Sequence, residues 1–268
     1  MYGRKVSRIV ANIDFGNVKA GTVGGFIEDT RNLSFKGDCW VANQAVVFDD
    51  ARISGNGVIG GSALAMNHAT ITDDAYVGDS VLLDCSAYIG GNAILKNTTY
   101  VSGAATIIGN TRIYCNAFRS NSGKTLMPNI SGLARIKDHV ILEGCLSIRD
   151  HAEIGDYACI TGRVRIYDHA SIGDFAFIEG LAAISGNARV TGHCHIRDRS
   201  RITNDSFVGG HVIVLGKSLI TGRACIVGDV VVENQTYSGD QYVTTRNGWL
   251  HIDPPDNVLR TRRADATA

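Results

Sequence analysis

Aliphatic side chains recur at every sixth position over a long stretch of the chain, from Ile136 to Val232. Two positions before each of them stands a small or slender residue, usually Ala, Val, Ser or Cys, and Leu146 is the one bulky exception. An α-helix turns once in about 3.6 residues, so a strict period of six would spread these side chains over its whole surface. The period instead predicts a parallel β-helix, in which each group of six residues forms one short strand and one turn, and stacked neighbours bury a common core.

A second register of the same repeat covers the first half of the chain, from Val41 to Ile113, with Ala65 as its weak position. Gly and Asp or Asn follow many of the aliphatic residues, and these residue types tolerate the backbone angles of tight turns. The register changes near residues 120–130, where Ser, Asn, Gly and Pro predict a loop that leaves the β-helix. We predict that this loop is a bulge of about five extra residues at one corner.

The repeat divides the chain into three parts. Residues 36–236 form the predicted β-helix with its loop near 120–130, and residues 1–35 precede it as an N-terminal cap. Residues 237–268 form a C-terminal cap and tail, with a last strand pair expected around Val243 and Ile252 and disorder from Arg260 to Ala268. Caps at the two ends would cover the strand edges that an open solenoid exposes.

Composition and charge narrow the classes of function. The 268 residues include 26 Lys plus Arg and 26 Asp plus Glu, so the chain lacks the basic field that holds a nucleic acid backbone. No apolar stretch is long enough for a signal peptide or a membrane span, which predicts a cytoplasmic protein without a membrane partner. Seven scattered cysteines without a C-x-x-C pair predict reduced thiols, and Cys39 and Cys194 fall on the small inward position.

The segment from Ile154 to Cys159, Ile-Gly-Asp-Tyr-Ala-Cys, resembles the hexapeptide repeats of left-handed β-helix acyltransferases. The segment from Ile13 to Gly21, together with Gly24 to Glu28, resembles the opening of YdcK-type hexapeptide proteins of bacteria and prophages. The resemblance implies an all-β, single-stranded, left-handed parallel β-helix with three hexads in each coil. It also implies transfer of an acetyl group from acetyl-coenzyme A (acetyl-CoA) to a small acceptor by a trimer that binds the coenzyme between its subunits.

Side chains one position before each aliphatic residue point outward, and those of successive coils form a column on one face. In the C-terminal half one column is apolar apart from a histidine, and it comprises Ile141, Cys159, Phe177, His195, Ile213 and Val231. In the N-terminal half a fully apolar column comprises Val46, Leu64, Leu82, Tyr100 and Phe118. A five-residue insertion would align the two columns into one apolar stripe, which predicts a homo-oligomer interface. Cover by the N-terminal cap or the C-terminal tail is the alternative.

His195 is the candidate general base because it projects from the middle of the apolar column, where an interface site would lie. A histidine that only packs in the interface is the alternative. Five other histidines share one turn position of the hexad: His139, His151, His169, His193 and His211. Four of these form pairs one coil apart, but no third ligand follows either pair, so no metal is expected. Two functions remain open, an acyltransferase with His195 as its base and a non-catalytic structural or binding solenoid of prophage type.

Overall fold

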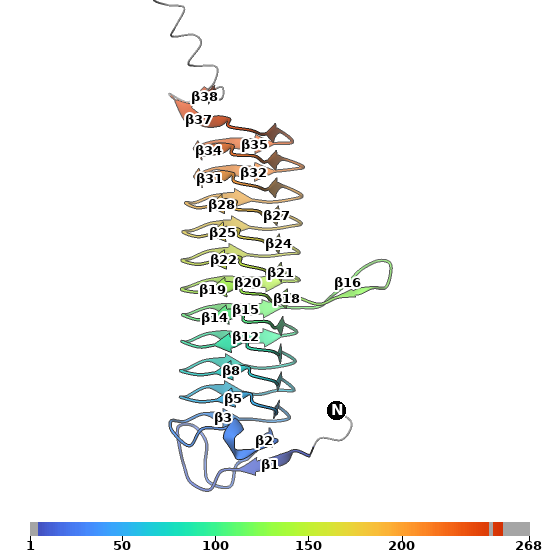
Figure 1. Ribbon diagram of the computed structural model, residues 1–268, viewed down its shortest axis with the longest axis vertical. Helices are drawn as coiled ribbons and strands as arrows, with labels where there is room; N and C mark the ends of the chain where they lie inside the picture. The colour runs from blue at the N-terminus through green and yellow to red at the C-terminus, as the bar shows by residue number, and fades with distance from the viewer. Residues whose placement is uncertain (1–4, 247–248, 254–268) are drawn as a thin grey trace, which may run out of the picture. The chain divides into compact units, whose positions relative to one another are not determined.

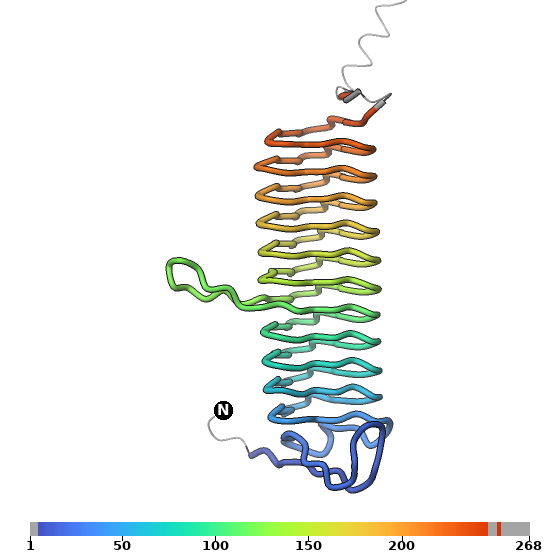
Figure 2. Tube along the Cα trace, turned by 180° about the vertical axis from the view of Figure 1, so that it is seen from behind, coloured from blue at the N-terminus to red at the C-terminus, as the bar shows by residue number. Residues whose placement is uncertain are grey.

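The computed structural model describes residues 5–246 and 249–253, and it consists of two compact units, Met1–Asp150 and His151–Ala268. In each unit the chain winds through successive coils of short strands linked by turns (Figures 1 and 2). The single helical element among the described residues is a 3-10 turn, η1 (Thr30–Asn32). The predicted fold is confirmed: the chain is an all-β, left-handed parallel β-helix.

In the first unit, the coils contribute strands to three parallel sheets, and partners such as Leu64 and Leu82 lie eighteen residues apart. One sheet comprises β4 (Val46–Val47), β7 (Leu64–Ala65), β10 (Leu82–Leu83), β13 (Tyr100–Val101), β18 (Asn129–Ile130) and β21 (Ser147–Ile148). The second comprises β5 (Arg52–Ile53), β8 (Thr70–Ile71), β11 (Tyr88–Ile89), β14 (Thr106–Ile107) and β19 (Arg135–Ile136). The third comprises β3 (Trp40–Val41), β6 (Val58–Ile59), β9 (Tyr76–Val77), β12 (Ile94–Asn97), β15 (Arg112–Cys115) and β20 (Ile141–Gly144).

The second unit also has three faces, each formed by one sheet. The first comprises β24 (Arg165–Ile166), β27 (Ala183–Ile184), β30 (Arg201–Ile202), β33 (Leu219–Ile220) and β36 (Thr236–Tyr237). The second comprises β22 (Glu153–Ile154), β25 (Ser171–Ile172), β28 (Arg189–Val190), β31 (Phe207–Gly210), β34 (Cys225–Gly228), β37 (Tyr242–Arg246) and β38 (Trp249–Asp253). The third comprises β23 (Cys159–Ile160), β26 (Phe177–Ile178), β29 (His195–Ile196), β32 (Ile213–Leu215) and β35 (Val231–Glu233). Strands β37 and β38 pair antiparallel, with Val243 opposite Ile252, whereas the expected tail from Arg260 to Ala268 lies outside the described residues.

The period of six follows from how each coil fills its interior. The second residue of most two-residue strands points inward, and side chains such as Ile178 and Ile196 are fully buried. Small residues two positions earlier, such as Ala176, are buried as well and leave room for the aliphatic side chains of the facing strands. Each buried Ile contributes about 2 kcal/mol of transfer free energy, so the stacked core stabilises the whole solenoid.

Aspartates at the corners link one coil to the next. Asp174 adopts a left-handed backbone conformation with φ of +54°, and its carboxylate accepts a hydrogen bond at 2.8 Å from the backbone N–H of Gly192, one coil later. Asp198 accepts the backbone N–H of Gly216 at 2.9 Å in the same way. Asp and Asn at these positions therefore tolerate the turn geometry and also satisfy a backbone donor of the neighbouring coil.

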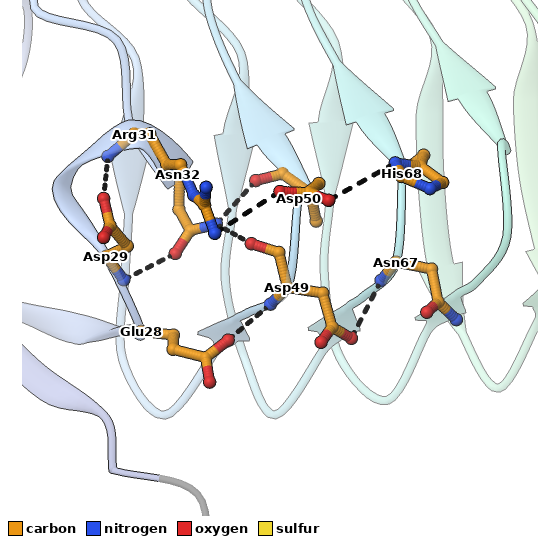
Figure 3. A network of polar contacts seen from close by, with 9 residues as sticks. Glu28, Asp29, Arg31, Asn32, Asp49, Asp50, Asn67 and His68 are labelled. Atoms are coloured by element: carbon orange, nitrogen blue, oxygen red, sulfur yellow. Dashed lines mark hydrogen bonds and ion pairs between the residues drawn. The ribbon is translucent and has the colours of Figure 1, made fainter.

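The N-terminal segment is attached to the first coils of the β-helix by strand pairing and by a network of polar contacts. Strand β1 (Ser7–Val10) pairs antiparallel with β2 (Val23–Ile27), and β2 pairs parallel with β4. The Asn32 side chain is fully buried and donates to the carbonyl oxygens of Asp49 and Ala51 at 2.9 and 2.8 Å. Its own carbonyl oxygen accepts from the backbone N–H of Asp29 at 2.8 Å (Figure 3). The side-chain amide of Asn32 therefore links the segment before the repeat to the first coils by hydrogen bonds.

The segment near residues 120–130 is longer than the sequence predicts. A hairpin of β16 (Phe118–Arg119) and β17 (Thr125–Leu126) leaves the coil (Figure 2), and Tyr100 of β13 pairs with Asn129, twenty-nine residues later instead of eighteen. The hairpin therefore inserts eleven residues, and the expected length of five is wrong. The difference arises because the hairpin pairs with itself, with Phe118 opposite Leu126, before the chain returns to the sheet.

The same insertion separates the two apolar columns. Asn129 and Ser147 follow Tyr100 on the sheet that holds Leu64 and Leu82, and Ile141 pairs with Arg112 on a different sheet. Phe118 lies on the hairpin and belongs to neither sheet. The alignment of Phe118 with Ile141 into one stripe is wrong, because eleven added residues return the chain one face away from where five would have placed it.

Candidate functional site

His195 occupies the outward position of β29 in the second unit. Parallel pairing places it between Phe177 of β26 and Ile213 of β32. Cys159 and Val231 extend the column on either side. The neighbouring residue Ile196 is buried in the core, so the strand fixes the direction in which the imidazole leaves the backbone.

A carboxylate lies against this imidazole. Oε1 of Glu179 is 3.0 Å from Nε2 of His195, and the two side chains are 37% and 30% exposed. The Phe177 ring covers part of the histidine, with 4.8 Å between the ring centroids and 45° between the planes. Glu179 stands directly after the buried Ile178, one coil before His195, so its backbone is held by the core of the solenoid.

The contact defines what the histidine can do chemically. A carboxylate that accepts a hydrogen bond from Nε2–H holds the ring in one tautomer, and Nδ1 then carries the lone pair. A neutral imidazole oriented in this way can take a proton from a hydroxyl or amine, and the adjacent carboxylate stabilises the imidazolium that forms. Sequence reasoning selected His195 and missed Glu179. The signal that could have found Glu179 is its position, one residue after the inward aliphatic residue of the preceding coil.

Three buried cysteine thiols are unsuited to nucleophilic chemistry. Cys194 precedes His195 but points inward, and burial raises the pKa of its thiol to about 11. Burial also raises the pKa of Cys115 to about 12 and that of Cys39 above its ordinary value. All three thiols are therefore protonated near neutral pH, and Cys39 and Cys194 are buried as expected for small core residues.

The turn histidines form stacks on a corner of the second unit. His151 and His169 stack with ring centroids 4.5 Å apart, and His193 and His211 with centroids 5.1 Å apart. Phe175 continues the second stack at 4.8 Å from His193. Among the described residues, no group of three or more His, Cys, Asp or Glu is placed to hold a metal ion.

The remaining candidate interface residues are divided between the two units. Leu64, Leu82 and Tyr100 occupy successive outward positions of one sheet in the first unit. The Tyr100 hydroxyl donates to Asp84 at 2.9 Å, and burial together with this carboxylate raises the pKa of Tyr100. Phe177 and Ile213 flank His195 in the second unit.

The sequence was compared with protein families and with known proteins. No family model matches the chain. The chain is 38% identical over 74 residues to the uncharacterized acetyltransferase YdcK of Escherichia coli strain K12, which confirms the resemblance to YdcK-type proteins. This similarity covers 27% of the chain and 23% of YdcK, so the match spans about a quarter of its relative's length.

Solved structures similar to the chain include two enzymes of one kind. LpxA from Acinetobacter baumannii is 13% identical, with 87% of this chain and 77% of that chain covered and a TM-score of 0.39. UDP-N-acetylglucosamine acyltransferase from Campylobacter jejuni is 15% identical, with 90% and 76% covered and a TM-score of 0.31. In the part of the chain that the structure describes, no helix has both the length and the apolar character needed to cross a membrane.

Proposed function

We propose that this protein is an acyltransferase that moves an acetyl group from acetyl-CoA to the hydroxyl or amine of a small acceptor, with His195 as the general base. The observation that carries the proposal is the contact between His195 and Glu179 on an otherwise apolar column. Apolar neighbours such as Phe177 and Ile213 would limit water near the reacting groups. The similarity to an acetyltransferase over part of the chain supports the same class of reaction.

The proposed reaction needs one base and one leaving group. Nδ1 of His195 takes the proton of the acceptor as its oxygen or nitrogen attacks the thioester carbonyl. Collapse of the tetrahedral intermediate breaks the carbon–sulfur bond, and the coenzyme thiolate leaves with the proton from His195. Glu179 keeps the imidazole oriented and stabilises its positive charge between these steps.

The experiment that tests the proposal is equilibrium binding of acetyl-CoA, followed by measurement of free coenzyme thiol in the presence of a panel of hydroxyl and amine acceptors. We expect saturable binding and acceptor-dependent thiol release. An isothermal titration without binding and an assay without thiol release would contradict the proposal. That result would favour the alternative of a non-catalytic binding solenoid, in which His195 only packs against Phe177.

We further propose that the protein is a homo-oligomer, a trimer by resemblance, with the Phe177, His195 and Ile213 column in its interface. Ile213→Asp should convert the oligomer to monomers, because an unpaired charge in an apolar contact costs several kcal/mol. Ser171→Asp, on the different sheet that contains β25, is the matched control and should leave the mass unchanged. Light scattering measures both. A monomeric unmodified protein, or equal masses for the two variants, would contradict the interface.

A further inference from the structure

One corner of the second unit carries four cations close to His195, although the whole chain has no net charge. Within a single coil the residues after His195 alternate between outward cations and inward or turn residues. The cations are Arg197, Arg199 and Arg201, and Lys217 follows Arg199 one coil later. We call these four residues the basic corner.

The backbone places these side chains on one continuous surface. Ile196 and Ile202 are buried in the core, and Ser200 is buried at the turn, so the arginines between them project outward. The N–H of Arg199 donates to Gly216 at 2.9 Å, which stacks the Arg199 turn on the Lys217 turn. Successive coils are about 4.8 Å apart. Arg199 and Lys217 therefore hold like charges side by side.

The basic corner has unused hydrogen-bond donors. Among the ion pairs of the described residues, none includes one of these four cations. Nε of Arg197 is buried without a hydrogen-bond partner. The neighbouring acids are already engaged, since Asp198 accepts the N–H of Gly216 at 2.9 Å and Glu179 contacts His195 at 3.0 Å. Adjacent cations with free donors favour an anion that can bridge them.

A surface hollow lies at this position. Arg199 and Lys217 line it together with Asp198, Leu181 and Asn234, and its volume is about 420 Å³. Arg199 stands four positions after His195, so their Cα atoms are at most about 14 Å apart along an extended chain. One small molecule is therefore long enough to place an anionic group in the hollow and its other end at His195.

We infer that the basic corner binds a phosphate group of a substrate whose acyl or acceptor end lies at His195. This inference rests on the proposed function, and it assigns the substrate class as phosphate-bearing. Arginine guanidinium groups match phosphate oxygens with two parallel hydrogen bonds, whereas the lysine ammonium adds a point charge. The phosphate would come either from the acyl donor or from a phosphorylated acceptor.

The test compares the double variant Arg199→Ala and Lys217→Ala with the control Arg189→Ala, in which an exposed arginine is removed from β28 on a different sheet. Affinity is measured by calorimetry for acetyl-CoA, for acetyl-pantetheine, which lacks phosphate, and for inorganic pyrophosphate. We expect the double variant to bind phosphate-bearing probes roughly tenfold or more weakly. Circular dichroism establishes that both variants are folded.

The three probes separate the outcomes. A loss for acetyl-CoA without a loss for acetyl-pantetheine supports the inference and places the phosphate on the donor. A loss for pyrophosphate alone supports it and places the phosphate on the acceptor. Equal affinities in the double variant and the control overturn the inference and leave the proposed function standing. Pyrophosphate binding at the basic corner by a protein that neither binds acetyl-CoA nor releases thiol would reject the proposed function and retain the anion site.

Discussion

Replacing His195 with glutamine is expected to lower kcat for acetyl transfer roughly a hundredfold to ten-thousandfold, the usual loss when a positioned general base is removed. Glutamine has a similar size and can still donate a hydrogen bond to Glu179, so the fold and the binding of acetyl-CoA should change little. A steady-state assay of thiol release gives kcat and KM separately, and the loss should appear in kcat. Glu179→Gln should lower kcat by a smaller factor, because it weakens the orientation of the imidazole without removing it.

His139→Ala is the control for this prediction. His139 is an exposed turn residue whose Nε2 lies 3.1 Å from Nδ2 of Asn110, and its removal should leave kcat within about twofold of the unmodified protein. Equal losses in the His195 and His139 variants would show that His195 is not the base. Transfer would then depend on another group, or the histidine would act only through packing.

Replacing Asn32 with alanine is expected to lower the free energy of unfolding of the first coils by about 2–4 kcal/mol. The side-chain amide is fully buried and bridges the N-terminal segment to the carbonyl oxygens of Asp49 and Ala51. Alanine would leave both carbonyl oxygens and the N–H of Asp29 without this partner. The bond from the Asp29 N–H is one half of the capping box of η1, so the cap would be weakened as well. Loss of a buried hydrogen-bond partner is more costly than loss of an exposed one.

Urea unfolding followed by Trp40 fluorescence measures this effect locally, in a Trp249→Phe background that leaves Trp40 as the single tryptophan. Trp40 is buried and lies 5.6 Å from the Phe15 ring, so its emission reports on the N-terminal end of the first unit. The matched control is Asn187→Ala, which removes an exposed hydrogen bond to Asp205 between coils and should change stability by about 0.5 kcal/mol or less. A shift no larger than that of the control would contradict the structural role of Asn32.

The fold could be predicted from sequence because its information is local. Each hexad contains its own inward aliphatic residue, its small partner and its turn residues, so the core at Ile178 or Ile196 is specified without knowledge of distant segments. The outward direction of His195 follows from the same alternation, and so does its position between Phe177 and Ile213. Because each coil contains three hexads, the position of a residue in the repeat indicates the face on which it lies.

The tertiary structure decided what depends on contacts between coils and on departures from the repeat. The sequence showed that a loop interrupts the period, but its length in the fold depends on a hairpin that pairs Phe118 with Leu126, and this pairing carries no hexad signal. The contact between Glu179 and His195 joins side chains from neighbouring coils at different positions of the hexad, so a search along one column could not find it. The sequence by itself determined the repeating core and the face on which His195 stands, because the period of six is set by burial within each coil. Only the tertiary structure decided three other features: the carboxylate beside that histidine, the buried amide of Asn32 and the face on which the chain continues after the hairpin. Each depends on contacts between residues of different coils or on the path of the chain through the hairpin, and neither is encoded within a single hexad.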